Sequence, residues 1–120
     1  MYSGCANAAV VLPITTAGFD WRLYSGMNIN VQAENTHGQG FHFRASAKTA
    51  HNATQPDDAG ARHMFLSRVC VGRSVPGNSN LRRPPAGFHS AVSGENPPKT
   101  VVIFDFVQAY PMYHITYRYQ

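Results

Sequence analysis

The sequence has little cysteine, little charge and no long hydrophobic run. Two cysteines in 120 residues, Cys5 and Cys70, are too few for a disulfide framework and are typical of a reducing compartment, although they leave a single bridge open. No basic segment followed by an apolar stretch marks a signal peptide, and nowhere do about 18 apolar residues run together, as a membrane span requires. We therefore expect a cytoplasmic or nuclear protein with no membrane partner.

The composition describes one small globular domain over residues 1–120. Hydrophobic residues make up 43% of the chain, enough for a single core. Ten basic residues, eight of them arginine, outnumber six acidic residues. This excess is compatible with a phosphate-bearing partner, yet the chain lacks the polybasic arm of many nucleic-acid-binding proteins. No repeat or low-complexity block occurs, and we expect a monomer.

Short apolar runs predict more strand than helix. Strands are expected where residues alternate or are β-branched, at 40–43, 63–72, 100–104 and 113–120. Helices are expected at 7–16, where Pro13 marks a break or a kink, and at 45–52. Clusters of glycine, proline and asparagine predict loops at 25–40, 75–87 and 92–99. Because no crossover helix follows residue 60, the strands should pair antiparallel in an α+β fold.

Tyrosines dominate the last predicted strand. Tyr113, Tyr117 and Tyr119 alternate with polar residues and share a face with Ile115. This face fits a stacking platform for single-stranded RNA, or a sheet packed on a core. Alternation explains the tyrosines more simply as core residues, so we do not expect nucleic acid to bind through this domain.

Five motifs follow one another over nearly the whole chain: Gly18-Phe19-Asp20-Trp21-Arg22, Gly38-Gln39-Gly40-Phe41-His42-Phe43, residues 64–72, Leu81-Arg82-Arg83-Pro84-Pro85, and residues 101–117 with Gln108-Ala109-Tyr110-Pro111. In this order they resemble the catalytic domain of poly(ADP-ribose) polymerases, especially the mono-ADP-ribosylating members that accompany CCCH zinc fingers and WWE domains. The resemblance implies a split antiparallel β-sheet that binds NAD in a cleft.

The start of the chain resembles the first NAD-binding strand of that family. Residues 1–5 resemble its Leu-Phe-His-Gly-Thr pattern, so we expect the strand and helix that ordinarily come before it to be missing. We expect the C-terminal part of the fold, with a sheet edge exposed, from a fragment or a short isoform. Residues 23–37 correspond to the loop that borders the donor site.

The family reaction breaks the bond between nicotinamide and ribose, develops positive charge at the anomeric carbon and passes ADP-ribose to a nucleophile. A histidine, a tyrosine and a glutamate serve it in most active polymerases. The resemblance places Ser3, His42 and Thr100 at these three positions. A serine at a strand end, a half-buried histidine and a β-branched strand residue are the ordinary structural interpretations of the same three residues.

Other positions of the implied NAD site keep part of the family pattern. Gly4 stands where a backbone group meets the nicotinamide amide, Thr49 where a hydroxyl bonds that amide, and Asn52 where a second tyrosine stacks. The same resemblance assigns Cys5 and Gly40 to the NAD-binding residues.

No nearby acid replaces the missing glutamate. Strand alternation turns Asp105 away from the face of Thr100, and Glu95 lies in a predicted loop. Relatives without the glutamate are understood to use a carboxylate of the acceptor, so the chain is expected to add at most one ADP-ribose from NAD to a protein.

Two alternatives to a transferase remain. One is a pseudoenzyme that binds NAD, ADP-ribose or a protein partner, and the other is a poorly folding fragment with neither function. The histidines, among them His37, His42, His51 and His63, show no zinc-site spacing, and we expect no metal.

Overall fold

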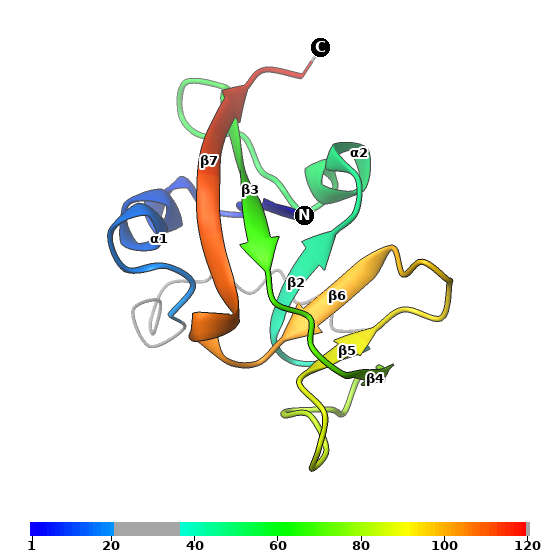
Figure 1. Ribbon diagram of the computed structural model, residues 1–120. Helices are drawn as coiled ribbons and strands as arrows, with labels where there is room; N and C mark the ends of the chain where they lie inside the picture. Colours follow the sequence, from blue (N-terminus) through cyan, green and yellow to red (C-terminus); the bar gives the residue numbers. More distant parts are fainter. Residues whose placement is uncertain (21–36, 120) are drawn as a thin grey trace.

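The computed structural model describes residues 1–20 and 37–119, which form a seven-stranded sheet with helices on both faces (Figure 1). The strand order is β4-β5-β6-β2-β1-β3-β7. The elements are β1 (Tyr2–Gly4), η1 (Ala8–Val10), α1 (Val11–Ala17), β2 (Phe41–Arg44), α2 (Ala47–His51), β3 (Arg62–Val69), β4 (Ser74–Pro76), β5 (Ser90–Val92), β6 (Thr100–Ile103), η4 (Phe106–Gln108) and β7 (Ala109–Tyr117). Residues 23–36 of the predicted donor-site loop, and Trp21-Arg22 of the first motif, lie outside the described residues.

The predicted α+β class is confirmed, and all five ladders that join neighbouring strands along β5-β6-β2-β1-β3-β7 are antiparallel, as predicted. The exception is the β4–β5 pair, which is parallel. These two short strands fall partly in segments predicted as loops, at 75–87 and 92–99, and that part of the prediction is wrong. Strand β4 was not predicted because Pro76 is typical of a loop. Proline is tolerated there because β4 lies at the edge of the sheet.

Both predicted helices are present with altered bounds. The segment 7–16 divides into η1 and α1, and the Asn7 side chain caps η1 by accepting a hydrogen bond from the backbone N–H of Ala9 at 2.9 Å. Pro13 lies in the first turn of α1, where backbone N–H groups have no partner within the helix, so it neither breaks nor kinks the helix there. The strand predicted at 100–104 ends at Ile103, and the one predicted at 63–72 ends at Val69.

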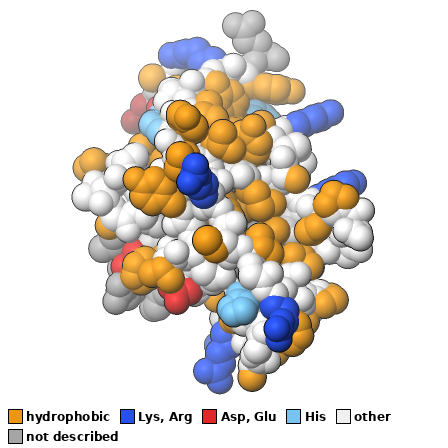
Figure 2. Space-filling model, in the orientation of Figure 1, with side chains coloured by type: hydrophobic (Ala, Val, Ile, Leu, Met, Phe, Trp, Pro, Cys, Tyr) orange, Lys and Arg blue, Asp and Glu red, His pale blue; other side chains and the backbone are white. Residues whose placement is uncertain are grey.

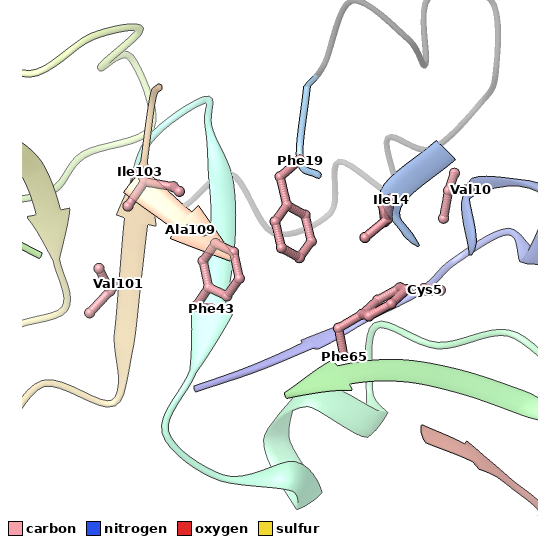
Figure 3. Packing of buried hydrophobic residues seen from close by; sticks show 9 residues of the cluster. All are labelled: Cys5, Val10, Ile14, Phe19, Phe43, Phe65, Val101, Ile103 and Ala109. Atoms are coloured by element: carbon pink, nitrogen blue, oxygen red, sulfur yellow. The ribbon is translucent and has the colours of Figure 1, made fainter. Parts of the chain in front are cut away.

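The core lies between the sheet and α1 (Figure 3). Phe19 packs edge-on against three rings from the sheet, with ring centres 5.6 Å from Phe41, 5.1 Å from Phe43 and 6.0 Å from Phe65. The opposite face of the sheet carries α2, and Gly4 marks their contact because a Cβ there would come within 2.3 Å of the Ala50 carbonyl oxygen. We call these two sides of the sheet the α1 face and the α2 face.

The tyrosines of β7 differ from the prediction. Tyr113 and Tyr119 keep 62% and 70% of their surface exposed, so the core interpretation is wrong for both. The reason is that β7 is an edge strand and α2 packs on β1 and β2, which leaves this end of the α2 face open. Tyr117 is half-buried, and its hydroxyl lies 2.7 Å from Nδ1 of His51.

Among the described residues, no helix has the length and apolar character needed to cross a membrane.

Candidate functional site

One row of directly paired residues crosses five strands of the sheet on the α2 face. Directly opposite residues of neighbouring strands point to the same side, so the row is fixed by the pairing register. From β6 to β7 its members are Thr100, Arg44, Tyr2, Leu66 and Tyr113. The exposed fraction is 4% at Thr100 and 8% at Arg44, and it rises to 62% at Tyr113. The row therefore joins a buried polar pair to an open aromatic surface.

His42 and Thr100 lie on this same face. His42 of β2 pairs with Val102 of β6, two residues along from the pair of Arg44 and Thr100, so His42 and Thr100 are diagonal neighbours on one face. The His42 ring is held by a 3.1 Å contact between its Nδ1 and the carbonyl oxygen of Gly40. Two of the three positions singled out in the sequence are thus brought together.

Arg44 is a residue of this site that the sequence analysis missed. Its guanidinium donates a hydrogen bond to the Thr100 hydroxyl, and both side chains are buried. A guanidinium stays charged in proteins, so a fixed positive charge stands beside Thr100, the residue that the motifs place at the position of the family glutamate. The signal was available in the sequence, because in a strand the second residue after His42 lies on the same face.

Ser3 does not join the other two. It pairs with Phe65, whose ring lies in the core, so the Ser3 side chain points to the α1 face while His42 and Thr100 point to the α2 face. Its hydroxyl is buried and finds no hydrogen-bond partner among the described residues. The structure therefore separates Ser3 from the polar pair of Arg44 and Thr100.

The two glycines of the predicted NAD site are explained by packing. Gly4 makes room for α2, as described above, and a Cβ on Gly40 would come within 2.2 Å of the Ile103 carbonyl oxygen. Cys5 is buried in the core cluster, where burial raises the pKa of its thiol to about 12. The Cys5 thiol is therefore a packing group in this structure, and no disulfide joins it to Cys70.

The two predicted site residues near α2 lie on its exposed side. Thr49 has its hydroxyl 2.9 Å from that of Ser46, the residue that caps the helix, and Asn52 is exposed at the other end. The residue of α2 that packs beside Gly4 is Ala50. The residue of α2 that lies beside Gly4 is therefore an alanine, which has no hydroxyl to offer.

The acidic residues considered as substitutes for the missing glutamate are engaged elsewhere. The Asp105 carboxylate caps η4 by accepting a hydrogen bond from the backbone N–H of Val107 at 3.1 Å. A hydrogen bond from the Ser93 side chain, and then one from backbone, lower the pKa of the exposed Glu95. Strands β2 and β6 themselves contain no carboxylate.

A separate chain of titratable groups runs across β3 and β7 on the α1 face. Nε2 of His63 lies 2.8 Å from Oδ2 of Asp57, and Nδ1 of His63 lies 2.9 Å from Nε2 of His114. The two rings are stacked, with their centres 5.1 Å apart and their planes 16° from parallel. Within the described residues, no three such groups are placed to hold a metal ion.

This histidine pair makes folding stability depend on pH. Burial and then the neighbouring His63 lower the pKa of His114 from its ordinary value of about 6.5, so the unfolded chain binds this proton more readily than the folded one. We expect stability to fall as pH drops below about 6.5 towards the lowered pKa of His114. Urea unfolding from pH 8 to 5 measures this. A stability difference between the parent and His114→Gln that stays constant with pH contradicts it.

Comparison with known proteins gives the same family as the sequence motifs. No family model matches the chain. Human protein mono-ADP-ribosyltransferase PARP12 is 34% identical over 118 residues, which is 92% of this chain and 16% of the relative. Human PARP14, a protein mono-ADP-ribosyltransferase, is 30% identical over 93% of this chain and 6% of the relative, and mouse PARP10 is 31% identical over 97% and 12%.

These matches, with the mixed and mostly antiparallel sheet, define an α+β domain of the ADP-ribosyltransferase type. The chain belongs to the poly(ADP-ribose) polymerase family and is similar to its mono-ADP-ribosyltransferases, which confirms the family predicted from the motifs. It spans less than a fifth of the length of these relatives.

Proposed function

We propose that this chain is an NAD-dependent transferase domain that adds a single ADP-ribose to a protein acceptor. The observation that carries the proposal is the similarity to mono-ADP-ribosyltransferases over more than nine-tenths of the chain. NAD is the donor of ADP-ribose in this chemistry. Arg44, Thr100 and His42 are the polar side chains of β2 and β6 that share the α2 face, and they form the place where we expect the donor to contact the protein.

The side chains present fit donor binding better than acceptor activation. His42 offers a ring with one nitrogen held by Gly40, and Arg44 offers a cation suited to a phosphate or a sugar hydroxyl. Strands β2 and β6 provide no carboxylate to accept a proton from the acceptor. An acceptor that supplies its own carboxylate needs no such base, and chain elongation on a ribose hydroxyl does, so the site favours one transfer per acceptor.

Binding without transfer is the second candidate function, favoured by the charge of Arg44. Breaking the bond to nicotinamide develops positive charge on the ribose, and a buried guanidinium beside that carbon raises the energy of the transition state. The Arg44–Thr100 hydrogen bond holds the guanidinium beside the Thr100 hydroxyl, where we expect the donor to bind. A folded domain of this kind acts through the nucleotide or protein that it binds.

Mass spectrometry of an acidic acceptor protein after incubation with NAD and this chain distinguishes these functions. The transferase proposal predicts adducts of one ADP-ribose per acceptor site, which hydroxylamine removes because it cleaves carboxylate esters. Asp105→Ala is the matched control and should give the same yield, since Asp105 caps η4 away from the pair of Arg44 and Thr100. Adducts of several linked units, or none from a chain that binds NAD, contradict single transfer.

A further inference from the structure

We propose that the open end of the α2 face binds single-stranded nucleic acid. Three side chains form this surface, Arg68 of β3 and Tyr110 and Tyr113 of β7, and we call it the tyrosine–arginine surface. The two tyrosines are 66% and 62% exposed, and Arg68 is exposed as well. The proposed transfer chemistry uses none of the three.

A β-bulge places both tyrosines on one side of the sheet. Tyr113 pairs with Leu66 and Tyr110 pairs with Arg68, and the register shifts between Leu66 and Ser67. Residues three apart in a regular strand point to opposite faces, so the extra residue of β7 restores Tyr110 to the face of Tyr113. Arg68, two residues after Leu66, stands on the same face directly opposite Tyr110.

The surface is open in the described part of the chain. Helix α2 packs on β1 and β2, and the rows of Leu66 and Arg68 lie beyond it. Figure 2 shows hydrophobic side chains gathered over β3 and β7, with a basic side chain among them. A contiguous patch of exposed apolar side chains marks a binding surface, whereas exposed apolar side chains scattered singly do not.

The charge of the surface selects an anionic partner. Strands β1, β3 and β7 contain no aspartate or glutamate, and the chain has a formal net charge of +4. Single strands bind where aromatic rings stack on bases and cations contact the phosphates between them. Tyr110 and Tyr113 provide the rings and Arg68 the cation.

A protein strand added to the edge of the sheet fits less well. Such a strand would need the backbone N–H groups of β7, yet Pro111 has none and the bulge interrupts the ladder beside it. Nucleic acid would contact side chains on the face of the sheet, so neither Pro111 nor the bulge prevents its binding.

Fluorescence anisotropy with the 120-residue chain tests the proposal in the absence of NAD, so its result is independent of the transfer proposal. The probes are fluorescein-labelled oligouridine RNA and oligothymidine DNA of about 15 nucleotides, with an RNA duplex of equal length for comparison. We expect saturable binding of single strands and weaker binding of the duplex. RNA bound more tightly than DNA would indicate contacts to the ribose hydroxyl, and equal binding would indicate stacking and phosphate contacts alone, both consistent with the surface.

Three variants of the surface and two controls elsewhere locate the site. Tyr113→Ala should weaken binding about tenfold because one stacked base is lost, while Tyr113→Phe should bind as the parent does. Arg68→Ala should reduce the slope of log affinity against log salt by about 0.7. Leu12→Ala and Arg83→Ala change an exposed leucine on α1 and an exposed loop arginine, and should leave binding unchanged.

Thermal unfolding of each variant confirms that it is folded, and Tyr110→Ala replaces Tyr113→Ala if the latter is not. The proposal is overturned if the parent binds no single strand, if the duplex binds equally well, or if folded Tyr110→Ala and Tyr113→Ala both bind as the parent does. It is also overturned if the chain forms a dimer that Tyr113→Ala dissociates and that binds no single strand.

Discussion

A chain that carries both Thr100→Glu and Arg44→Ala is expected to transfer ADP-ribose about a hundredfold faster than one that carries Thr100→Glu alone. In the single variant the new carboxylate meets the guanidinium that now bonds to Thr100, and the two form a buried ion pair. A paired carboxylate is a poor base because its pKa is low. Removing the arginine frees the carboxylate and also removes a cation that opposes the positive charge of the transition state.

The rate of adduct formation from NAD measures this effect. Thr100→Gln with Arg44→Ala is the matched control, since it removes the same cation without supplying a base and should stay well below the rate of the chain with Thr100→Glu and Arg44→Ala. Because Arg44 is buried, its replacement can destabilise the fold, so thermal unfolding is measured for every variant to show that each is folded. Equal rates with and without Arg44 would show that this residue does not limit the chemistry.

Phe65→Ala is expected to destabilise the domain by about 3–5 kcal/mol, a large part of the stability of a chain this small. Phe65 is 1% exposed and packs edge-on against Phe19, and its other ring neighbour, His114, lies 5.2 Å away. The cavity left by the ring cannot be filled from α1 without moving that helix away from the sheet.

Urea unfolding at constant pH gives this free energy. Leu12→Ala is the control, because a leucine that is 73% exposed loses little on truncation. A loss under about 1 kcal/mol for Phe65→Ala, equal to that of Leu12→Ala, would mean that the ring is not part of the core.

Local sequence patterns predicted β2, β3, β6 and both helices, because their runs of apolar and helix-favouring residues are local features of the sequence. They did not predict β4 and β5, whose short segments are strands through pairing with each other and with β6. The strand at the end of the chain begins at Ala109, four residues before its predicted start, because Pro111 and the bulge beside it break the alternation on which the prediction depended.

The site was predicted in part for a related reason. The motifs identified His42 and Thr100, and alternation placed Thr100 and Val102 on one face, which the structure confirms. The register between two strands cannot be predicted from the sequence of either strand alone. The Arg44–Thr100 contact and the orientation of Ser3 towards the core were therefore known only from the strand pairing in the structure. The exposure of Tyr113 likewise depended on which strand ended the sheet.

The most direct test of this account is a calorimetric titration of the folded chain with NAD and with ADP-ribose. The account predicts saturable binding of both ligands, weakened about fivefold by His42→Ala and unchanged by Asp105→Ala, since His42 shares the α2 face with Arg44 and Thr100 whereas Asp105 caps η4. A chain that unfolds cooperatively and yet binds neither ligand would contradict the claim that this domain uses NAD.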